Sequence, residues 1–176
     1  MFIPGFLISM LTFPGVIVHE YAHMLFCRLF RVAIFEVCYI RWGNPAGYVI
    51  HEIPRKQWQH ILIGVGPFFV NTILGGLIAA PAAIPVIKFG TGTPLDFLLI
   101  YLGVSIAMHA FPSTGDAKSM WNAIWKEKSS LGVKIAVTPI VGIIMLGALG
   151  SMMWLDLAYG VGIAVGLPNL IIYLAA

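Results

Sequence analysis

Two histidines and a glutamate are the residues of this 176-residue chain whose spacing points most directly to chemistry. His19 and His23 flank Glu20 in a His-Glu-x-x-His motif. Residues four apart on a helix lie on the same face, so the two imidazoles can bind one Zn²⁺. The ion lowers the pKa of its bound water from about 15.7 to about 7, and a neighbouring glutamate can accept the proton. The motif predicts Zn²⁺ as the cofactor, His19 and His23 as ligands and Glu20 as the catalytic base.

The motif lies within an apolar stretch that extends on both sides of it. The chain is 60% hydrophobic and 10% charged, whereas soluble domains carry about 25% charged residues. Ionisable side chains at membrane depth are costly and are usually functional, which favours a metal site over a pair of core histidines. We therefore predict an all-α integral membrane protein in contact with the lipid bilayer. Its net charge of +3 is assigned to loops at the membrane surface, with no nucleic-acid partner.

The hydropathy pattern predicts one polytopic domain over residues 1–176 with about five transmembrane helices. These are expected over residues 3–30, 57–80, 94–111, 131–155 and 157–174. Pro14-Gly15 is expected to bend the first helix, and Pro81 and Pro85 to end the second. A short amphipathic helix at the membrane surface is expected over residues 116–128. The catalytic core would cover about residues 5–130, followed by additional spans over 131–176.

Residues 32–40 and 48–53 are rich in Val, Ile, Phe and Tyr, and a turn-forming stretch separates them. This pattern predicts a small β-hairpin after the first helix, associated with the membrane. An irregular loop is the alternative.

The basic residues give an orientation. With five spans, nine of the ten Lys and Arg residues fall on one side, and only Lys88 falls on the other. The positive-inside rule then places the N-terminus outside and the C-terminus in the cytosol. His19 precedes Arg28 by nine residues, about 14 Å along a helix, so the active site would lie within the bilayer near the cytosolic face.

Catalytic zinc sites of this type use a third protein ligand. Asp96 and Asp156 fall at the expected outer surface, which is the wrong end. Asp116 follows the break after the third span and is the predicted third ligand, with a role as a helix N-terminal carboxylate as its alternative. His109 is the rival ligand. Otherwise His109 would support the site by hydrogen-bonding a ligand or the substrate.

Three stretches of the chain resemble the site-2 protease family of intramembrane zinc metalloproteases. They are His19-Glu20-Tyr21-Ala22-His23, Gly66-Pro67 and the run from His109 to Asp116, so that the resemblance covers about residues 5–130. The family's third-ligand aspartate usually lies in an Asn-x-x-Pro-x-x-Pro-Leu-Asp-Gly run. Here His109 stands in place of that asparagine, the second proline and the Asp-Gly pair are absent, and Asp116 comes one residue early.

The family also often shows Gly-Pro-x-x-Asn. In this chain Asn71 comes one residue late, which rotates it by about 100° on a helix. The resemblance therefore implies at most a supporting role for Asn71.

The resemblance implies cleavage of a transmembrane protein substrate near the cytosolic side of the membrane. A substrate helix must unwind before its peptide bond is accessible, and an edge of the predicted hairpin could pair with the unwound segment. The alternative is a non-catalytic zinc-binding membrane protein, either an inactive relative of the protease or a transporter. A transporter should carry polar residues through several spans, and the last two predicted spans have almost none.

Overall fold

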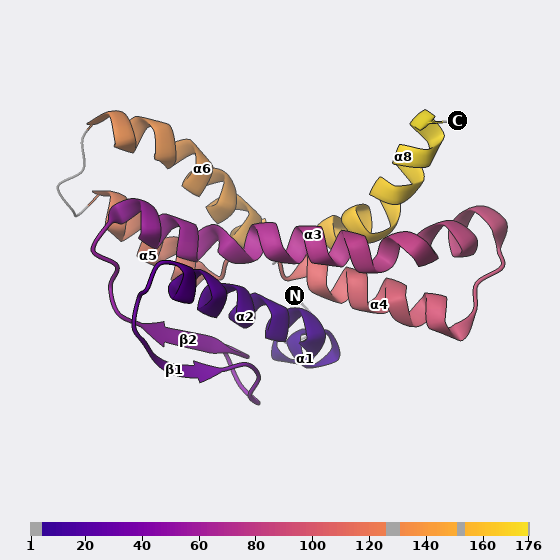
Figure 1. Cartoon of the computed structure of the whole chain (residues 1–176), viewed down its shortest axis with the longest axis horizontal. Coiled ribbons are helices and arrows are strands. Elements are labelled where there is room, and N and C mark those ends of the chain that lie inside the picture. Colours follow the sequence, from indigo (N-terminus) through magenta and orange to yellow (C-terminus); the bar gives the residue numbers. More distant parts are fainter. Residues whose placement is uncertain (1–4, 126–130, 151–153, 176) are drawn as a thin grey trace.

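The computed structural model describes residues 5–125, 131–150 and 154–175 of the chain. In this part the protein is mostly helical, with one two-stranded antiparallel sheet, and the helix α3 runs along its long axis (Figure 1). The elements are α1 Gly5–Leu11, α2 Phe13–Leu29, β1 Ile34–Cys38, β2 Tyr48–His51, α3 Gln57–Phe89, α4 Pro94–Met108, α5 Thr114–Trp125, α6 Leu131–Gly150, α7 Leu155–Val161, the π-helical segment η2 Gly162–Gly166 and α8 Leu167–Ala175.

The first predicted span is a bent pair of helices. The axes of α1 and α2 make an angle of 91°, and the break lies at Thr12, two residues before the predicted Pro14-Gly15. A break frees backbone groups that need new partners. Ser105 of α4 supplies two of them, because its Oγ donates to the Thr12 carbonyl at 2.9 Å and accepts from the Gly15 N–H at 3.1 Å. The bend is therefore attached to α4.

The prediction that Pro81 and Pro85 end the second span is wrong. The helix α3 continues through both prolines to Phe89 and ends at Gly90, whose backbone is left-handed with φ 63°. A proline fixes a φ angle that is compatible with a helix and removes one N–H donor. The two prolines are four residues apart, so both missing donors lie on one face of the helix. An apolar helix packed against neighbours tolerates them.

The prediction of about five transmembrane helices is wrong for the residues that the structure describes. Two segments are long and apolar enough to cross a membrane, Gln57–Phe89 and Leu155–Leu174, and the bent pair α1–α2 makes a third if it counts as one span. The helix α4 has 15 residues and reaches about 22 Å, short of the about 30 Å of a hydrocarbon core. The fourth predicted span includes residues 151–153, which lie outside the described residues, and α6 forms its first part.

The last apolar segment, Leu155–Leu174, runs parallel to α3. The Tyr159 hydroxyl lies 2.8 Å from Thr72 Oγ1, and one turn further along, Ile163 lies against Gly76. Both segments therefore end towards the same end of the molecule, as Figure 1 shows for α8 and the end of α3.

The predicted hairpin is confirmed as an antiparallel pair. Cys38 lies opposite Tyr48 and Ile34 opposite His51, with a register irregularity between Ile34 and Glu36. Both strands pack against α2, which carries the His-Glu-x-x-His motif. The hairpin is thus placed beside the predicted site.

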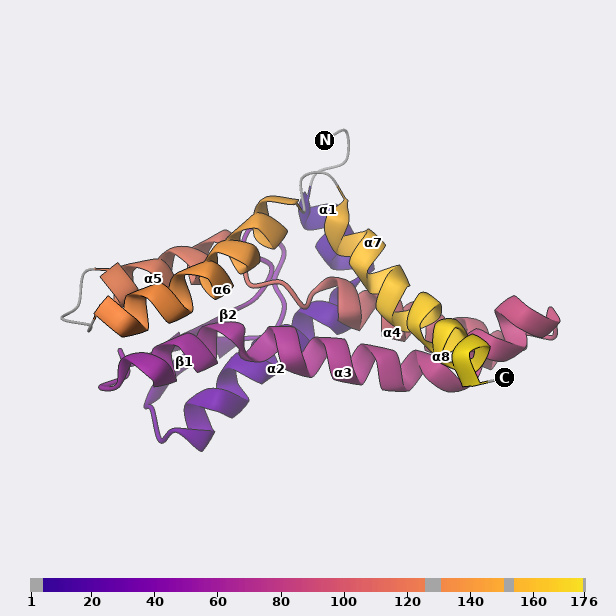
Figure 2. The same cartoon turned by 90° about the horizontal axis from the view of Figure 1, so that it is seen from above.

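The predicted amphipathic helix is α5, which begins two residues earlier than expected. Residues 126–128 of the prediction lie outside the described part of the chain. Met120 and Ile124 of α5 are fully buried in a cluster with Val65 of α3 and Val141 of α6. Figure 2 shows α5 lying alongside α6. This packing sets the position of the helix whose first turn carries Asp116.

Candidate metal centre

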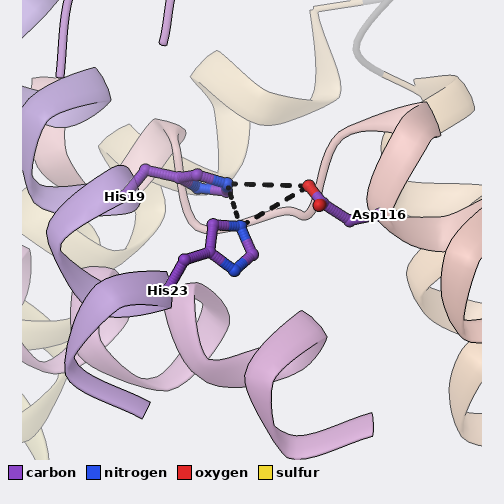
Figure 3. Close-up of side chains that lie close together, drawn as sticks. All are labelled: His19, His23 and Asp116. Carbon is purple, nitrogen blue, oxygen red and sulfur yellow. Dashed lines mark hydrogen bonds and ion pairs between the residues drawn. The ribbon is translucent and has the colours of Figure 1, made fainter. Parts of the chain in front are cut away.

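The structure brings His19, His23 and Asp116 together, as Figure 3 shows. The two Nε2 atoms lie 3.2 Å apart, and Asp116 Oδ2 lies 4.0 Å from His19 Nε2 and 3.5 Å from His23 Nε2. Neighbouring ligand atoms around a tetrahedral zinc, with bonds of about 2.0–2.1 Å, are about 3.3–3.4 Å apart. Two of the three distances match that spacing closely, and a small movement of the carboxylate would bring the third into range.

The other ring nitrogen of each histidine faces a backbone carbonyl. His19 Nδ1 lies 2.7 Å from the His109 carbonyl, and His23 Nδ1 lies 2.9 Å from the Ile63 carbonyl. A carbonyl can only accept, so each Nδ1 carries a proton and donates it. In the neutral rings both Nε2 lone pairs are then directed to the space between the two rings. A shared cation would remove the repulsion between these lone pairs, so the donor set fits a metal ion.

Asp116 lies in the first turn of α5 and is held by Ser113. The backbone N–H and the hydroxyl of Ser113 donate to Asp116 Oδ2 at 3.0 and 2.6 Å, and the Asp116 N–H donates back to Ser113 Oγ at 3.2 Å. This is a capping box, so Asp116 is a helix N-terminal carboxylate and also faces the histidines. Burial raises the pKa of the Asp116 carboxyl. The interactions with His23 and His19 lower this pKa by more than burial raises it, so it lies well below its ordinary value.

Glu20 is buried and lines the same cavity as the three candidate ligands. The turn of the hairpin lies directly against it. A Cβ atom added at Gly47 would lie 2.6 Å from Glu20 Cγ and 3.0 Å from Glu20 Oε1. Gly47 therefore permits an approach to the glutamate that a larger residue would prevent.

The cavity has a volume of about 700 Å³ and includes residues that the sequence did not indicate. His51 of β2 and Asp156 of α7 line it, together with the hairpin turn and α1. The prediction that Asp156 lies at the outer surface, away from the site, is wrong. That prediction depended on a count of five spans. None of the described residues that line the cavity is Lys or Arg. No local pattern marks Asp156, whose position depends on how α7 packs against α4.

His109 does not direct its ring to the other histidines. Its Nε2 lies 2.8 Å from Thr12 Oγ1, and because the Thr12 hydroxyl donates to the Ile8 carbonyl at 2.7 Å, the ring nitrogen is the donor. The backbone carbonyl of His109 instead accepts from His19. His109 thus hydrogen-bonds a candidate ligand through its backbone, while its side chain holds the α1–α2 break.

Asn71 is fully buried beneath the site. Its Nδ2 lies 3.1–3.2 Å from the carbonyls of Gly15, Ile106 and His109, so it links α2, α3 and the end of α4. One of these carbonyls is the group that orients His19. The late position of Asn71 in the sequence pattern therefore still allows it to support the site.

Comparisons of the chain with family models, with curated proteins and with solved structures gave no match. The function is therefore inferred from the residues of the site and their geometry.

Proposed function

We propose that this protein is an intramembrane zinc metalloprotease that hydrolyses a peptide bond in a membrane-spanning substrate near the cytosolic side. The observation that carries the proposal is the convergence of His19, His23 and Asp116 from two helices, with each imidazole oriented by a backbone carbonyl. Glu20 lies in the same cavity, on the helix that carries both histidines.

Each residue of the site has a role in this reaction. His19, His23 and Asp116 would hold the zinc, which when bound supplies a Lewis acid. Glu20 takes the proton of the water that attacks the peptide carbonyl carbon, and passes it to the amine that leaves when the C–N bond breaks. The cavity of about 700 Å³ is large enough for an unwound stretch of peptide.

The hairpin offers the unwound segment partners for its backbone. The described sheet has two strands, so each strand keeps one edge with unpaired N–H and C=O groups. The hairpin turn also forms part of the cavity wall. A substrate strand paired to this sheet would therefore lie close to Glu20, which supports strand addition as the mode of binding.

The position along α3 supports a site near the basic end of the protein. Ile63, whose carbonyl orients His23, is six residues after the start of α3, about 9 Å along the helix. Arg55 and Lys56 immediately precede that start, and Lys88 lies at the opposite end of α3. We therefore keep the cytosolic assignment of this end.

The assignment of the C-terminus changes. Because Leu155–Leu174 runs parallel to α3, it ends on the side opposite to the basic end, and we propose that the C-terminus lies outside. The earlier cytosolic assignment followed from counting five spans.

The test combines metal analysis with a substitution of Glu20. Protein purified in detergent without chelators should carry about one zinc per chain. Glu20→Gln should keep the zinc and lower cleavage of single-span transmembrane test substrates by about 100-fold or more, because only the proton acceptor is removed. Absence of zinc in the wild-type protein would overturn the proposal. Bound zinc with no cleavage by the wild-type protein would favour the non-catalytic alternative.

A further inference from the structure

The carboxylate of Asp116 has a hydrogen-bond partner that is not itself a candidate metal ligand. Ser113 donates two hydrogen bonds to Asp116 Oδ2, the same oxygen that lies 3.5 Å from His23 Nε2. A carboxylate on a short side chain rotates over a broad range about its last torsion. Two donors from one residue restrict that rotation and hold the oxygen towards the histidines.

The helix itself does not depend on Ser113 for its position. The apolar face of α5 is buried against α3 and α6 through Met120 and Ile124. The Gln57 side chain of α3 also donates to the Ala123 carbonyl. Packing thus sets where α5 lies, and the hydroxyl of Ser113, together with its backbone N–H, restricts how the carboxylate at the first turn is rotated.

We propose that Ser113 is a positioning residue for the third zinc ligand, an inference that rests on the proposed zinc site. Its hydroxyl fixes the Asp116 carboxylate in the orientation that faces His19 and His23. Residues that hydrogen-bond a metal ligand typically change metal affinity by about 10–100-fold when they are removed. Ser113 lines the cavity, and we expect it to act on the metal through Asp116 rather than as a ligand itself.

The chain contains a matched control at the start of α4. Thr93 donates from its N–H and hydroxyl to Asp96 Oδ2 at 2.8 and 2.7 Å, and accepts from the Asp96 N–H at 3.3 Å. Neither residue lines the cavity of the candidate site. Substitution of Thr93 therefore reports the effect of losing a helix cap alone.

The experiment measures Zn²⁺ affinity of the full chain in detergent by competition with a chelator. Ser113→Gly removes the hydroxyl, and glycine costs little at this helix position. Ser113→Thr keeps a hydroxyl, and Thr93→Gly is the control. Ser113→Gly should weaken zinc binding by about 10–100-fold. Ser113→Thr and Thr93→Gly should bind zinc as the wild-type protein does.

Two results would overturn the inference. One is wild-type zinc affinity in Ser113→Gly, and the other is an equal loss in Thr93→Gly, which would assign the effect to general destabilisation. Thermal unfolding of the metal-free variants should show similar shifts for the two glycine substitutions. A wild-type protein that binds no zinc would instead refute the proposed function, so the two failures are distinguishable.

Discussion

Consecutive helices of this protein begin with the same capping box, and only one of the two boxes faces a candidate metal centre. Thr93–Asp96 at α4 and Ser113–Asp116 at α5 have hydrogen-bond lengths that differ by at most 0.2 Å in each corresponding pair. Asp96 lies at the start of α4, at the end of the molecule near Gly90. Asp116 lies at the start of α5 and faces His19 and His23. The same local motif therefore caps a helix in both places, and in one of them its carboxylate also faces two histidines.

The difference arises from what lies across from each box. The α4 box follows the loop after α3 and has no described side chain of α2 bonded to it. The α5 box follows the turn after α4, and that turn is tied to α2 by the His109 carbonyl, which accepts from His19. A capping carboxylate thus becomes a potential ligand when a second helix brings histidines to it.

The largest effect is expected when the carboxylate charge of the α5 box is removed, and the same substitution in the α4 box is the control. Asp116→Asn should weaken zinc binding by more than about 100-fold, beyond the about 10–100-fold typical of supporting residues. Asp96→Asn should leave zinc affinity unchanged. The measurement is chelator competition on both variants. Equal zinc affinity of the two variants would contradict the proposal that only the α5 box contributes a zinc ligand.

The opposite wall of the cavity offers a test that leaves both boxes intact. Gly47→Ala places a methyl group against Glu20, and a displacement of about 1 Å can reduce catalysis by about 100-fold. Zinc content should not change, because the three atoms nearest to the added methyl group belong to Glu20 and Tyr39 and not to a candidate ligand. Gly5→Ala is the control, since Gly5 also lines the cavity and a Cβ there meets nothing within 4 Å. Full cleavage activity in Gly47→Ala would contradict a catalytic role for Glu20 in its present position.

His109→Ala is expected to have a smaller effect on metal binding than Asp116→Asn. The backbone carbonyl that orients His19 is retained in this variant, so zinc affinity should fall by about tenfold at most. Loss of the ring removes its hydrogen bond to Thr12, so the thermal stability of the protein should also fall. If His109→Ala strips the zinc and Asp116→Asn retains it, the site contains three histidines and the assignment of the α5 box is wrong.

Parts of the fold and of the site follow from local sequence. The four-residue spacing of His19 and His23 places them on one face of any helix, and the Val- and Tyr-rich stretches around a turn predicted the hairpin. Asp116 was identified because it follows a break in an apolar stretch. These features depend on the period of a helix or strand and on nearby turn residues, which a short segment carries by itself.

Other features depend on contacts between segments far apart in the chain. His19 and the His109 carbonyl are 90 residues apart, and Asn71 joins three helices through carbonyls of different segments. The continuation of α3 through Pro81 and Pro85, the entry of Asp156 into the cavity and the direction of the last apolar segment also required the packed structure.

The sequence by itself determined a largely apolar, mostly helical chain with a His-Glu-x-x-His motif beside a hairpin. The sequence predicted that Asp116 faces that motif, but only the tertiary structure shows this contact, because Asp96 and Asp116 have the same local capping pattern. Local hydrogen bonds are set by residues within one turn. The approach of α5 to α2 is instead set by the burial of side chains such as Met120 and Ile124 against other helices, which no single segment encodes.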